Sequence, residues 1–304
     1  MVRDGQVGAC GAREGNAEAR AVVDQNYGRI TSLALDPIEK KPIARWMPGC
    51  AVVSVGSYGC NLRCPFCQNA SLACARADDV PWQFLTPEEL VSLTAITRAE
   101  HLAGPEYRAD DAAANTHQDF EQAAAEARQR NAAAHDVPTI GLAYTYNEPL
   151  VGWEYVRDCS ELAHGQGLFN VLVSNGMANR AVIEELLPLI DAANIDLKGF
   201  TQDCYDFVGG SLETVKATIE LFARQPTCHL EVTTLVVPGR NDDPEQIEAA
   251  AVWLASINQG IPYHLTRFFP CHNLQDALPT DVKQLRHLQE VAQRYLETVL
   301  LGNV

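Results

Sequence analysis

The chain is short of positive charge and has no long apolar run, and each shortage excludes a class of function. Its 304 residues hold 23 Lys and Arg against 39 Asp and Glu, a formal net charge of −16. This balance repels phosphate backbones and anionic membrane surfaces, so we expect no nonspecific binding of nucleic acid and no membrane binding. No stretch approaches the roughly 18 consecutive apolar residues that span a bilayer, and the first twenty residues match neither a signal sequence nor a transit peptide. These features predict a cytoplasmic protein.

Cysteine, by contrast, is abundant. Ten cysteines are many for a cytoplasmic chain, where a reducing environment disfavours structural disulfides. Seven of them are scattered, whereas Cys60, Cys64 and Cys67 fall within eight residues. This distribution points to metal ligation or thiol chemistry rather than to a disulfide framework.

The pattern from Ala51 onward predicts an α/β protein. Short apolar runs with β character alternate with amphipathic helical runs, which is typical of βα units around a parallel sheet. Thr86-Pro87 and Asp243-Pro244 are suitable helix starts, with a capping side chain followed by Pro at the first helical position. The expected strands are Ala51–Gly56, Thr139–Tyr144, Phe169–Ser174, Ala193–Leu197, His229–Val237 and Tyr263–Phe268.

Three segments lie outside this alternation. Residues 1–48 are polar and predict an N-terminal extension with one short strand in Arg29–Leu35, before a core of residues 49–275. Residues 101–136 are rich in Ala and polar, which favours a surface insertion within that core. Residues 276–304 predict a C-terminal helix that covers one side of the sheet, because apolar residues recur at helical spacing from Val282 to Val299.

The cysteine triplet follows the first expected strand directly, at the carboxyl edge where parallel α/β folds place their chemistry. Three thiolates on one loop can hold zinc or an iron–sulfur cluster. A structural zinc site needs a fourth protein ligand, and only Cys74 lies nearby in the sequence. A [4Fe–4S] cluster held by three thiolates leaves one iron open for a ligand. The spacing favours the cluster, with zinc or unliganded thiols as the alternatives.

The segment from Gly59 to Asn69 resembles the signature of the radical S-adenosylmethionine (SAM) superfamily, in which an aromatic residue precedes the third cysteine. Phe66 occupies that aromatic position. Further motifs resemble the radical SAM enzyme of the AmmeMemoRadiSam system, which is similar in turn to pyruvate formate-lyase activating enzymes. These motifs are Asp36–Pro42, Tyr144–Pro149, Ser174–Gly176 and Asp196–Gly199.

The resemblance implies a fold, two cofactors and a set of site residues. The fold is an incomplete (β/α)6 barrel of the TIM type, and the cofactors are a [4Fe–4S] cluster and SAM. An electron from the cluster cleaves SAM into methionine and a 5′-deoxyadenosyl radical, which abstracts hydrogen from a substrate. The implied cluster ligands are Cys60, Cys64 and Cys67, and the implied SAM contacts are Phe66, Asn69, Asn147, Glu148, Ser174, Asn175, Asp196, Lys198 and His264.

Individual roles follow from the chemistry of these side chains. Asn147 and Glu148 offer acceptors to the ammonium of SAM. Asp196 and Lys198 alternate along one strand, so a carboxylate for ribose hydroxyls and an ammonium for the SAM carboxylate can share one face. Taken alone, the same residues also fit a helix start and an ordinary salt bridge, and a lone His264 fits a structural histidine.

The motifs do not identify the substrate. One hypothesis is an activating enzyme that abstracts hydrogen from a glycine of a glycyl radical enzyme. Another is a direct catalyst that modifies a small molecule or a macromolecule, acting with the two namesake proteins of the AmmeMemoRadiSam system. A third is a noncatalytic metal-binding protein, against which the SAM motifs argue. Reductive cleavage also implies an electron donor such as flavodoxin or ferredoxin.

Overall fold

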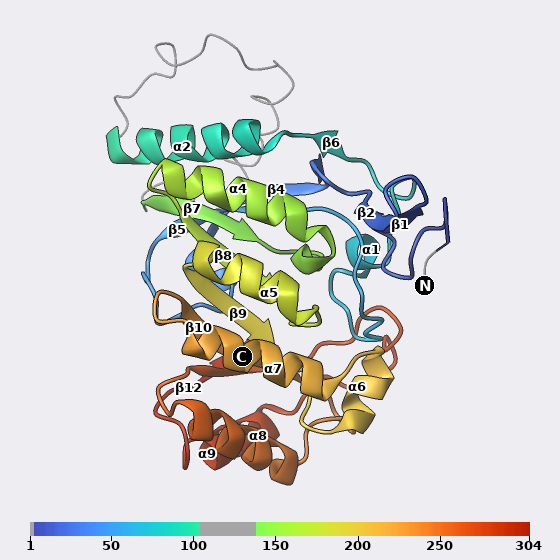
Figure 1. Ribbon diagram of the computed structural model, residues 1–304. Helices are drawn as coiled ribbons and strands as arrows, with labels where there is room; N and C mark the ends of the chain where they lie inside the picture. The colour runs from blue at the N-terminus through green and yellow to red at the C-terminus, as the bar shows by residue number, and fades with distance from the viewer. Residues whose placement is uncertain (1–2, 104–137) are drawn as a thin grey trace.

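The structure is a computed structural model that describes residues 3–103 and 138–304, shown in Figure 1. The expected insertion at 101–136 lies outside the described residues, except that its first three residues end a helix. Among the described residues, none of the helices is long and apolar enough to cross a membrane.

One curved eight-stranded sheet organises the molecule. The strands lie in the order β12-β11-β10-β9-β8-β7-β5-β4, and every neighbouring pair is parallel except β4 with β5. Within the described residues the end strands do not pair with each other, so the barrel is not closed. The strands are β4 (Ser32–Pro37), β5 (Ala51–Gly56), β7 (Thr139–Tyr144), β8 (Phe169–Ser174), β9 (Ala192–Asp196), β10 (His229–Val236), β11 (Tyr263–Arg267) and β12 (Val299–Gly302).

These strands confirm the predicted α/β class and incomplete barrel. All six predicted strands form, with bounds that agree to within one residue at each end. They are nearly continuous apolar runs because a parallel sheet is covered on both faces. In β5, Val53 and Val55 pack into the main core beneath the helices, while Val52 faces the inner side of the sheet and packs with Ile38 and Ile43.

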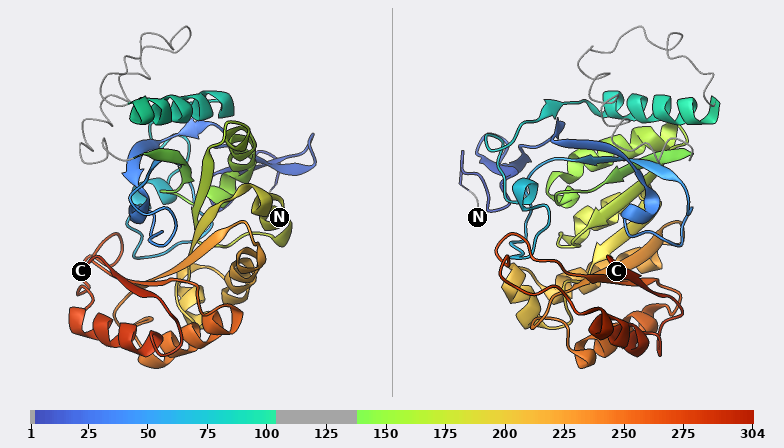
Figure 2. Two further views of the ribbon diagram at one scale, coloured as in Figure 1. Left: turned by 90° about the vertical axis from the view of Figure 1, so that its left-hand side faces the viewer. Right: turned by 180° about the vertical axis from the view of Figure 1, so that it is seen from behind.

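Helices cover the outer face of the sheet, as Figures 1 and 2 show. Both predicted helix starts form. Thr86 Oγ1 accepts from Glu89 N at 3.2 Å, and Asp243 Oδ1 accepts from Glu245 N at 3.0 Å. The longer helices are α2 (Pro87–Ala103), α4 (Trp153–Gly165), α5 (Arg180–Leu186), α6 (Gln202–Val208), α7 (Leu212–Arg224), α8 (Pro244–Ile257) and α9 (Val282–Ala292).

The N-terminal segment is part of the central fold rather than a simple extension. A hairpin of β1 (Arg13–Asn16) and β2 (Ala21–Asp24) leads to β4, which pairs antiparallel with β5 at the sheet edge. The chain then continues through residues 38–50, which we call the floor segment. The floor segment lies against the inner face of the sheet, where Ile38 and Ile43 are fully buried.

The predicted C-terminal helix is wrong in its last part. The helix α9 ends at Ala292, and Val299–Gly302 forms β12, which pairs parallel with β11. Leu296 and Val299 fit a helical spacing, but they also suit a strand. Pairing satisfies backbone groups of β11 that would otherwise be left at an open edge, and this contact between distant segments decides the outcome.

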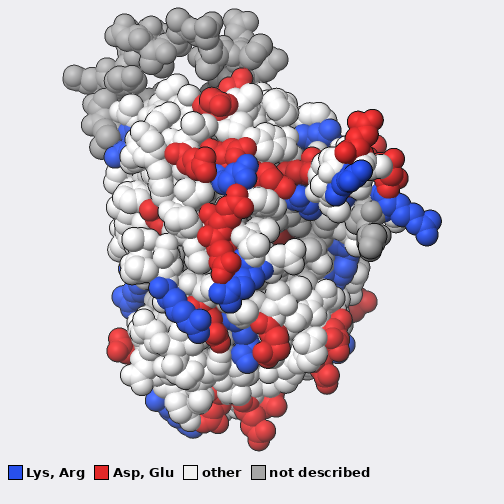
Figure 3. Space-filling view, in the orientation of Figure 1, with Lys and Arg blue, Asp and Glu red and all other residues white. Residues whose placement is uncertain are grey.

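The surface reflects the acidic composition. On the face shown in Figure 3, Asp and Glu side chains gather over α4 and α5, with Lys and Arg among them. Arg157 on α4, for example, lies 2.8 Å from Asp158 and 2.9 Å from Glu185. Such exposed ion pairs contribute little to the free energy of folding. The buried polar groups described next hold the loops of the site in place.

Candidate functional site

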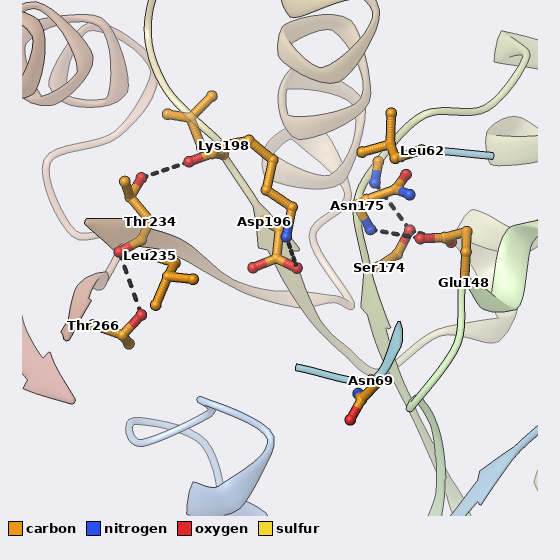
Figure 4. A network of polar contacts seen from close by, with 12 residues as sticks. Leu62, Asn69, Glu148, Ser174, Asn175, Asp196, Lys198, Thr234, Leu235 and Thr266 are labelled. Carbon is orange, nitrogen blue, oxygen red and sulfur yellow. Dashed lines mark hydrogen bonds and ion pairs between the residues drawn. The ribbon is translucent and has the colours of Figure 1, made fainter. Parts of the chain in front are cut away.

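Most of the predicted site residues come together at the carboxyl edge of the parallel sheet. The cysteine loop follows β5, Glu148 follows β7, Asn175 follows β8, and Asp196 and Lys198 lie at the end of β9. Figure 4 shows the side chains of Glu148, Ser174 and Asn175 on one side and those of Asp196 and Lys198 on the other. The strand topology therefore brings together residues that are far apart in the sequence.

The backbone of the cysteine loop is held by the segment that precedes the N-terminal hairpin. Cys60 N donates to Cys10 O at 3.0 Å. Gly59 has φ +90, and a Cβ at this position would stand 2.5 Å from Cys10 O, so only glycine allows the close approach. Two donors also reach the Cys60 sulfur: Leu62 N at 3.4 Å and Asn175 Nδ2 at 3.5 Å.

The three thiols are in an environment that keeps them protonated until a cation binds. Burial raises the pKa of Cys60 to about 12 and that of Cys64 to about 11. Burial also raises the pKa of Cys67, while the positive charge of Lys198 works in the opposite direction on all three. A bound metal centre ionises its coordinating thiols, so these cysteines would release protons on binding.

The donor set fits a three-thiolate cluster. In a four-iron cluster each thiolate binds a different iron, and N–H groups near the sulfurs tune the cluster, as Leu62 N and Asn175 Nδ2 could here. Over the described ranges, 3–103 and 138–304, no group of three or more His, Cys, Asp or Glu side chains is placed to hold a single metal ion.

Glu148 is the centre of a buried hydrogen-bond network beside the loop. Its carboxylate accepts from Ser174 Oγ at 2.7 Å, from Asn175 N at 2.8 Å and from Leu150 N at 3.0 Å. Burial raises the pKa of Glu148 to about 7, although these three donors act to lower it. The side chain is 3% exposed and has no cationic partner among the described residues. An incoming ammonium group would supply the missing positive charge.

Asp196 and Lys198 form an ion pair at 2.8 Å across the site from Glu148. Burial acts to lower the pKa of Lys198, but Asp196 and the thiols of Cys64 and Cys67 outweigh it, so the pKa lies above its ordinary range. The Lys198 ammonium therefore pairs with one carboxylate at the sheet edge that also carries the cysteine loop. This position lets it bind a carboxylate brought by a ligand.

The backbone of Lys198 is fixed by two residues that the sequence did not single out for this role. Lys198 N donates to Tyr205 Oη at 3.2 Å, and Asn241 Nδ2 donates to Lys198 O at 2.9 Å. Asn241 also donates to Leu235 O at 2.9 Å and so ties together the turns after β9 and β10. Asn241 follows the predicted strand His229–Val237, which places it at this edge of the sheet but does not indicate this contact.

Some predicted SAM contacts make other interactions. Asn147 Oδ1 accepts from Ser57 N at 2.9 Å, and its Nδ2 lies 3.1 and 3.2 Å from Tyr58 O and Gly59 O, so the amide braces the cysteine loop. Phe66 is buried and its ring stacks with Phe207, with 6.4 Å between centroids. Whether Asn147 and Phe66 also contact SAM stays a prediction.

Asn69 and His264 also have partners within the chain. Asn69 Nδ2 donates to Tyr146 O at 2.8 Å, which links the cysteine loop to the turn that carries Glu148. His264 Nε2 lies 2.5 Å from Glu231 Oε2 on the inner face of the sheet. Whether these two side chains contact SAM stays a prediction.

A second buried carboxylate supports the same turn. Tyr146 Oη donates to Asp36 Oδ2 at 2.9 Å, and Lys41 Nζ donates to that oxygen at 2.7 Å. Asp36 is fully buried, but Lys40 and Lys41 together hold its pKa well below its usual range against the effect of burial. The Asp36–Pro42 motif was part of the resemblance without an assigned role, and the structure shows that it anchors Tyr146.

Comparisons with known proteins identify the family of the chain. The model of the Radical SAM superfamily matches residues 108–251. An uncharacterized protein of Methanocaldococcus jannaschii is 31% identical over 307 residues, which cover 100% of this chain and 78% of that protein.

Two solved structures are similar to this chain, and the first of them illustrates the similarity of fold. A radical SAM methyltransferase from Sphaerobacter thermophilus has a TM-score of 0.55 at 14% identity, covering 84% of this chain and 67% of the other. A domain of pyruvate-formate lyase-activating enzyme from Bacteroides vulgatus has a TM-score of 0.46 at 19% identity, covering 53% and 98%. The sequence match and the fold together place the chain in the radical SAM superfamily, whose members use a [4Fe–4S] cluster and SAM.

Proposed function

We propose that this protein binds a [4Fe–4S] cluster through Cys60, Cys64 and Cys67 and cleaves SAM reductively at the open iron. The observation that carries the proposal is the position of Lys198, whose ammonium pairs with Asp196 at 2.8 Å at the same sheet edge as the cysteine loop. When bound, the cluster supplies the electron that divides SAM into methionine and a 5′-deoxyadenosyl radical, which abstracts a hydrogen atom. A flavodoxin or a ferredoxin is the proposed electron donor.

The residues around the loop have complementary charges for the methionine part of SAM. Glu148 is a buried carboxylate without a cationic partner among the described residues, which suits the ammonium group. Lys198 suits the carboxylate group, and Asp196 is 29% exposed and available to hydroxyl groups. Ser174 and Asn175 hold Glu148 in place through hydrogen bonds. The chain thus supplies an anionic and a cationic group on opposite sides of one site.

The test is anaerobic reconstitution followed by reaction with SAM and dithionite. We expect methionine and 5′-deoxyadenosine in equal amounts by mass spectrometry. A Lys198→Met variant should keep the cluster spectrum and lose most of this turnover. A protein that holds only zinc, or that has the cluster but produces no 5′-deoxyadenosine, would contradict the proposal.

For the substrate, we propose a glycine residue of a partner enzyme, as in glycyl radical activation. The motif resemblance to activating enzymes supports this assignment. Mixing the reduced holoenzyme and SAM with pyruvate formate-lyase tests it, because a glycyl radical gives a characteristic electron paramagnetic resonance doublet. SAM cleavage without that doublet would remove this substrate while leaving the cleavage reaction in place.

Direct reaction with a small polar molecule is the second candidate. The observation that favours it is the polar lining of the inner face, where Asp36 pairs with Lys41 and Glu231 pairs with His264. Buried charged groups are costly, and a backbone glycine does not require them. The two namesake proteins of the AmmeMemoRadiSam system are the proposed partners in this case. Transfer of deuterium from a labelled small molecule into 5′-deoxyadenosine would support it.

A further inference from the structure

Two exposed arginines lie at the cysteine loop. Arg63 belongs to the loop itself, and its Nη1 donates to Cys60 O at 2.8 Å and to Leu62 O at 2.9 Å. Arg240 lies in the turn after β10, and its guanidinium carbon stands 4.0 Å from the centre of the Phe207 ring on α6. Both arginines are exposed, so another protein that approaches the loop can contact them.

The end of α6 joins the two arginines to each other and to the cysteine loop. Arg63 N donates to Val208 O at 2.7 Å, and Val208 is the last residue of α6. Phe207 precedes it, so Arg63 and Arg240 contact the same end of this helix. The Phe207 ring also stacks with Phe66, which comes directly before the third cysteine of the loop. Contacts therefore run without a break from Arg240 at the surface to the residue beside a proposed cluster ligand.

Neither arginine has an acidic partner in the described part of the chain. No Asp or Glu of these residues, the exposed Asp203 and Asp206 on α6 included, forms an ion pair with Arg63 or Arg240. Arg224, by contrast, pairs with a glutamate one turn away. Because the whole chain carries a net charge of −16, it repels an acidic protein. Unpaired cations therefore select the place where such a protein can approach.

The chemistry of this surface fits an acidic electron carrier with a flat aromatic redox group. Reductive cleavage of SAM consumes an electron, which a carrier must bring to the cysteine loop. The two guanidinium groups suit carboxylates on the carrier, and the half-buried Phe207 ring suits the apolar edge of a flavin. A ferredoxin holds its cluster in cysteine thiolates and presents no such ring. The aromatic centre therefore favours a flavodoxin.

We propose that Arg63, Phe207 and Arg240 form the docking surface for a flavodoxin, which binds through acidic side chains around its flavin. The inference rests on the proposed function, because the cluster is the group that the flavodoxin reduces. In this step one electron moves from the flavin hydroquinone, which becomes the semiquinone, to the oxidised cluster, which becomes reduced. No covalent bond forms or breaks, so the surface has only to bind and orient the carrier.

The test follows reduction of the holoenzyme's cluster by stopped-flow absorbance, with flavodoxin hydroquinone as the reductant. At about 0.01 M salt, Arg240→Glu should lower the second-order rate constant about tenfold, because repulsion replaces attraction at the docking surface. Near 1 M salt the difference should shrink to less than about twofold, since the Debye length falls to about 3 Å. Reduced methyl viologen, a small cation that needs no docking surface, should reduce the variant at least as fast as the wild type.

Arg224→Glu is the matched control, because it changes the net charge by the same amount at another place. Arg224 ends α7 shortly before β10 begins, so it lies at the amino edge of the sheet, opposite the cysteine loop. This variant should keep the flavodoxin rate constant within about twofold of wild type. Equilibrium binding of oxidised flavodoxin, measured by isothermal titration calorimetry, should weaken in Arg240→Glu and not in Arg224→Glu. Should Arg240→Glu fail to fold, Arg240→Ala serves in its place.

Three results would overturn the inference. They are an unchanged flavodoxin rate constant in Arg240→Glu, equal slowing in Arg240→Glu and Arg224→Glu, and slowing with a ferredoxin but not with flavodoxin. The same data distinguish this inference from the proposed function. A cluster that flavodoxin reduces at the wild-type rate in every variant refutes the docking surface alone. A reduced wild type that yields no 5′-deoxyadenosine from SAM refutes the proposed function itself.

Discussion

Replacing Glu148 with Gln should weaken SAM binding and should remove a loss of folding stability that the wild type suffers as the pH rises. The carboxylate is 3% exposed, and its pKa is about 7 in the fold against 4.5 as the ordinary value. The unfolded chain therefore releases this proton at lower pH than the folded protein does. Folding stability falls as the pH rises between the two values, since the folded state must hold an ionised carboxylate that burial disfavours.

The size of the effect follows from the pKa difference. Each pKa unit corresponds to about 1.4 kcal/mol, so the wild type should lose about 2.5 kcal/mol at Glu148 between about pH 5 and about pH 8. Glutamine does not titrate. Its amide nitrogen would face Asn175 N, which donates to the carboxylate at 2.8 Å, and this adds a cost that is the same at both pH values. The variant should therefore gain stability relative to the wild type as the pH rises.

Urea unfolding of wild type and variant at about pH 5 and about pH 8 measures this difference, and SAM titration at about pH 8 measures binding. We expect SAM affinity to fall about ten- to a hundredfold in Glu148→Gln, because a charge-assisted contact is lost. Glu161→Gln, at an exposed position on α4, is the control. A Glu148→Gln variant that is destabilised equally at both pH values would refute the assigned pKa, and unchanged SAM affinity would refute the ligand role.

Three further predictions test other parts of the site. Reconstituted protein should hold about four irons and four sulfides per chain. Replacing Cys60, Cys64 or Cys67 with Ala should reduce the iron content to background, whereas the control variant Cys74→Ala should keep the full iron content. Lys198→Met should keep the cluster spectrum but weaken SAM binding about ten- to a hundredfold, and unchanged affinity would show that the ion pair with Asp196 is only structural. Tyr146→Phe removes a 2.9 Å hydrogen bond to Asp36 and should lower the free energy of unfolding by about 1 kcal/mol in urea titrations, with iron content unchanged; an unaltered midpoint would argue against the anchoring role.

The strands of the sheet could be predicted because each carries its own signal. β5 and β7 are buried along their whole length, so the sequence shows short apolar runs between polar loops. Of the two edge strands, β4 overlaps the short strand predicted in Arg29–Leu35, whereas β12 was not predicted. Among the described residues β12 pairs only with β11, and its residues fit a helical spacing as well as a strand, so a contact between distant segments decides its structure.

The sequence allowed us to predict which loops meet at the site. It did not allow us to predict which side chains there are left without a hydrogen-bond partner from the chain itself. Residues that follow parallel strands must lie at one edge, and this brought Glu148, Asn175 and Lys198 together. The partners of Asn147 depend on the exact path of the cysteine loop, whose carbonyls at Tyr58 and Gly59 face its amide. Nothing in an Asn-Glu-Pro sequence indicates that path.

The buried carboxylates show why Glu148, rather than its counterparts, is the expected ligand for a cation. Asp36 is paired with Lys40 and Lys41, and its pKa is lowered. Glu231 receives hydrogen bonds from two histidines, and its pKa is also lowered. Within the described part of the chain Glu148 has only neutral donors, and its pKa is raised to about 7. Since the chain neutralises the other two with its own groups, the uncompensated charge of Glu148 is the one that a bound ammonium group would stabilise.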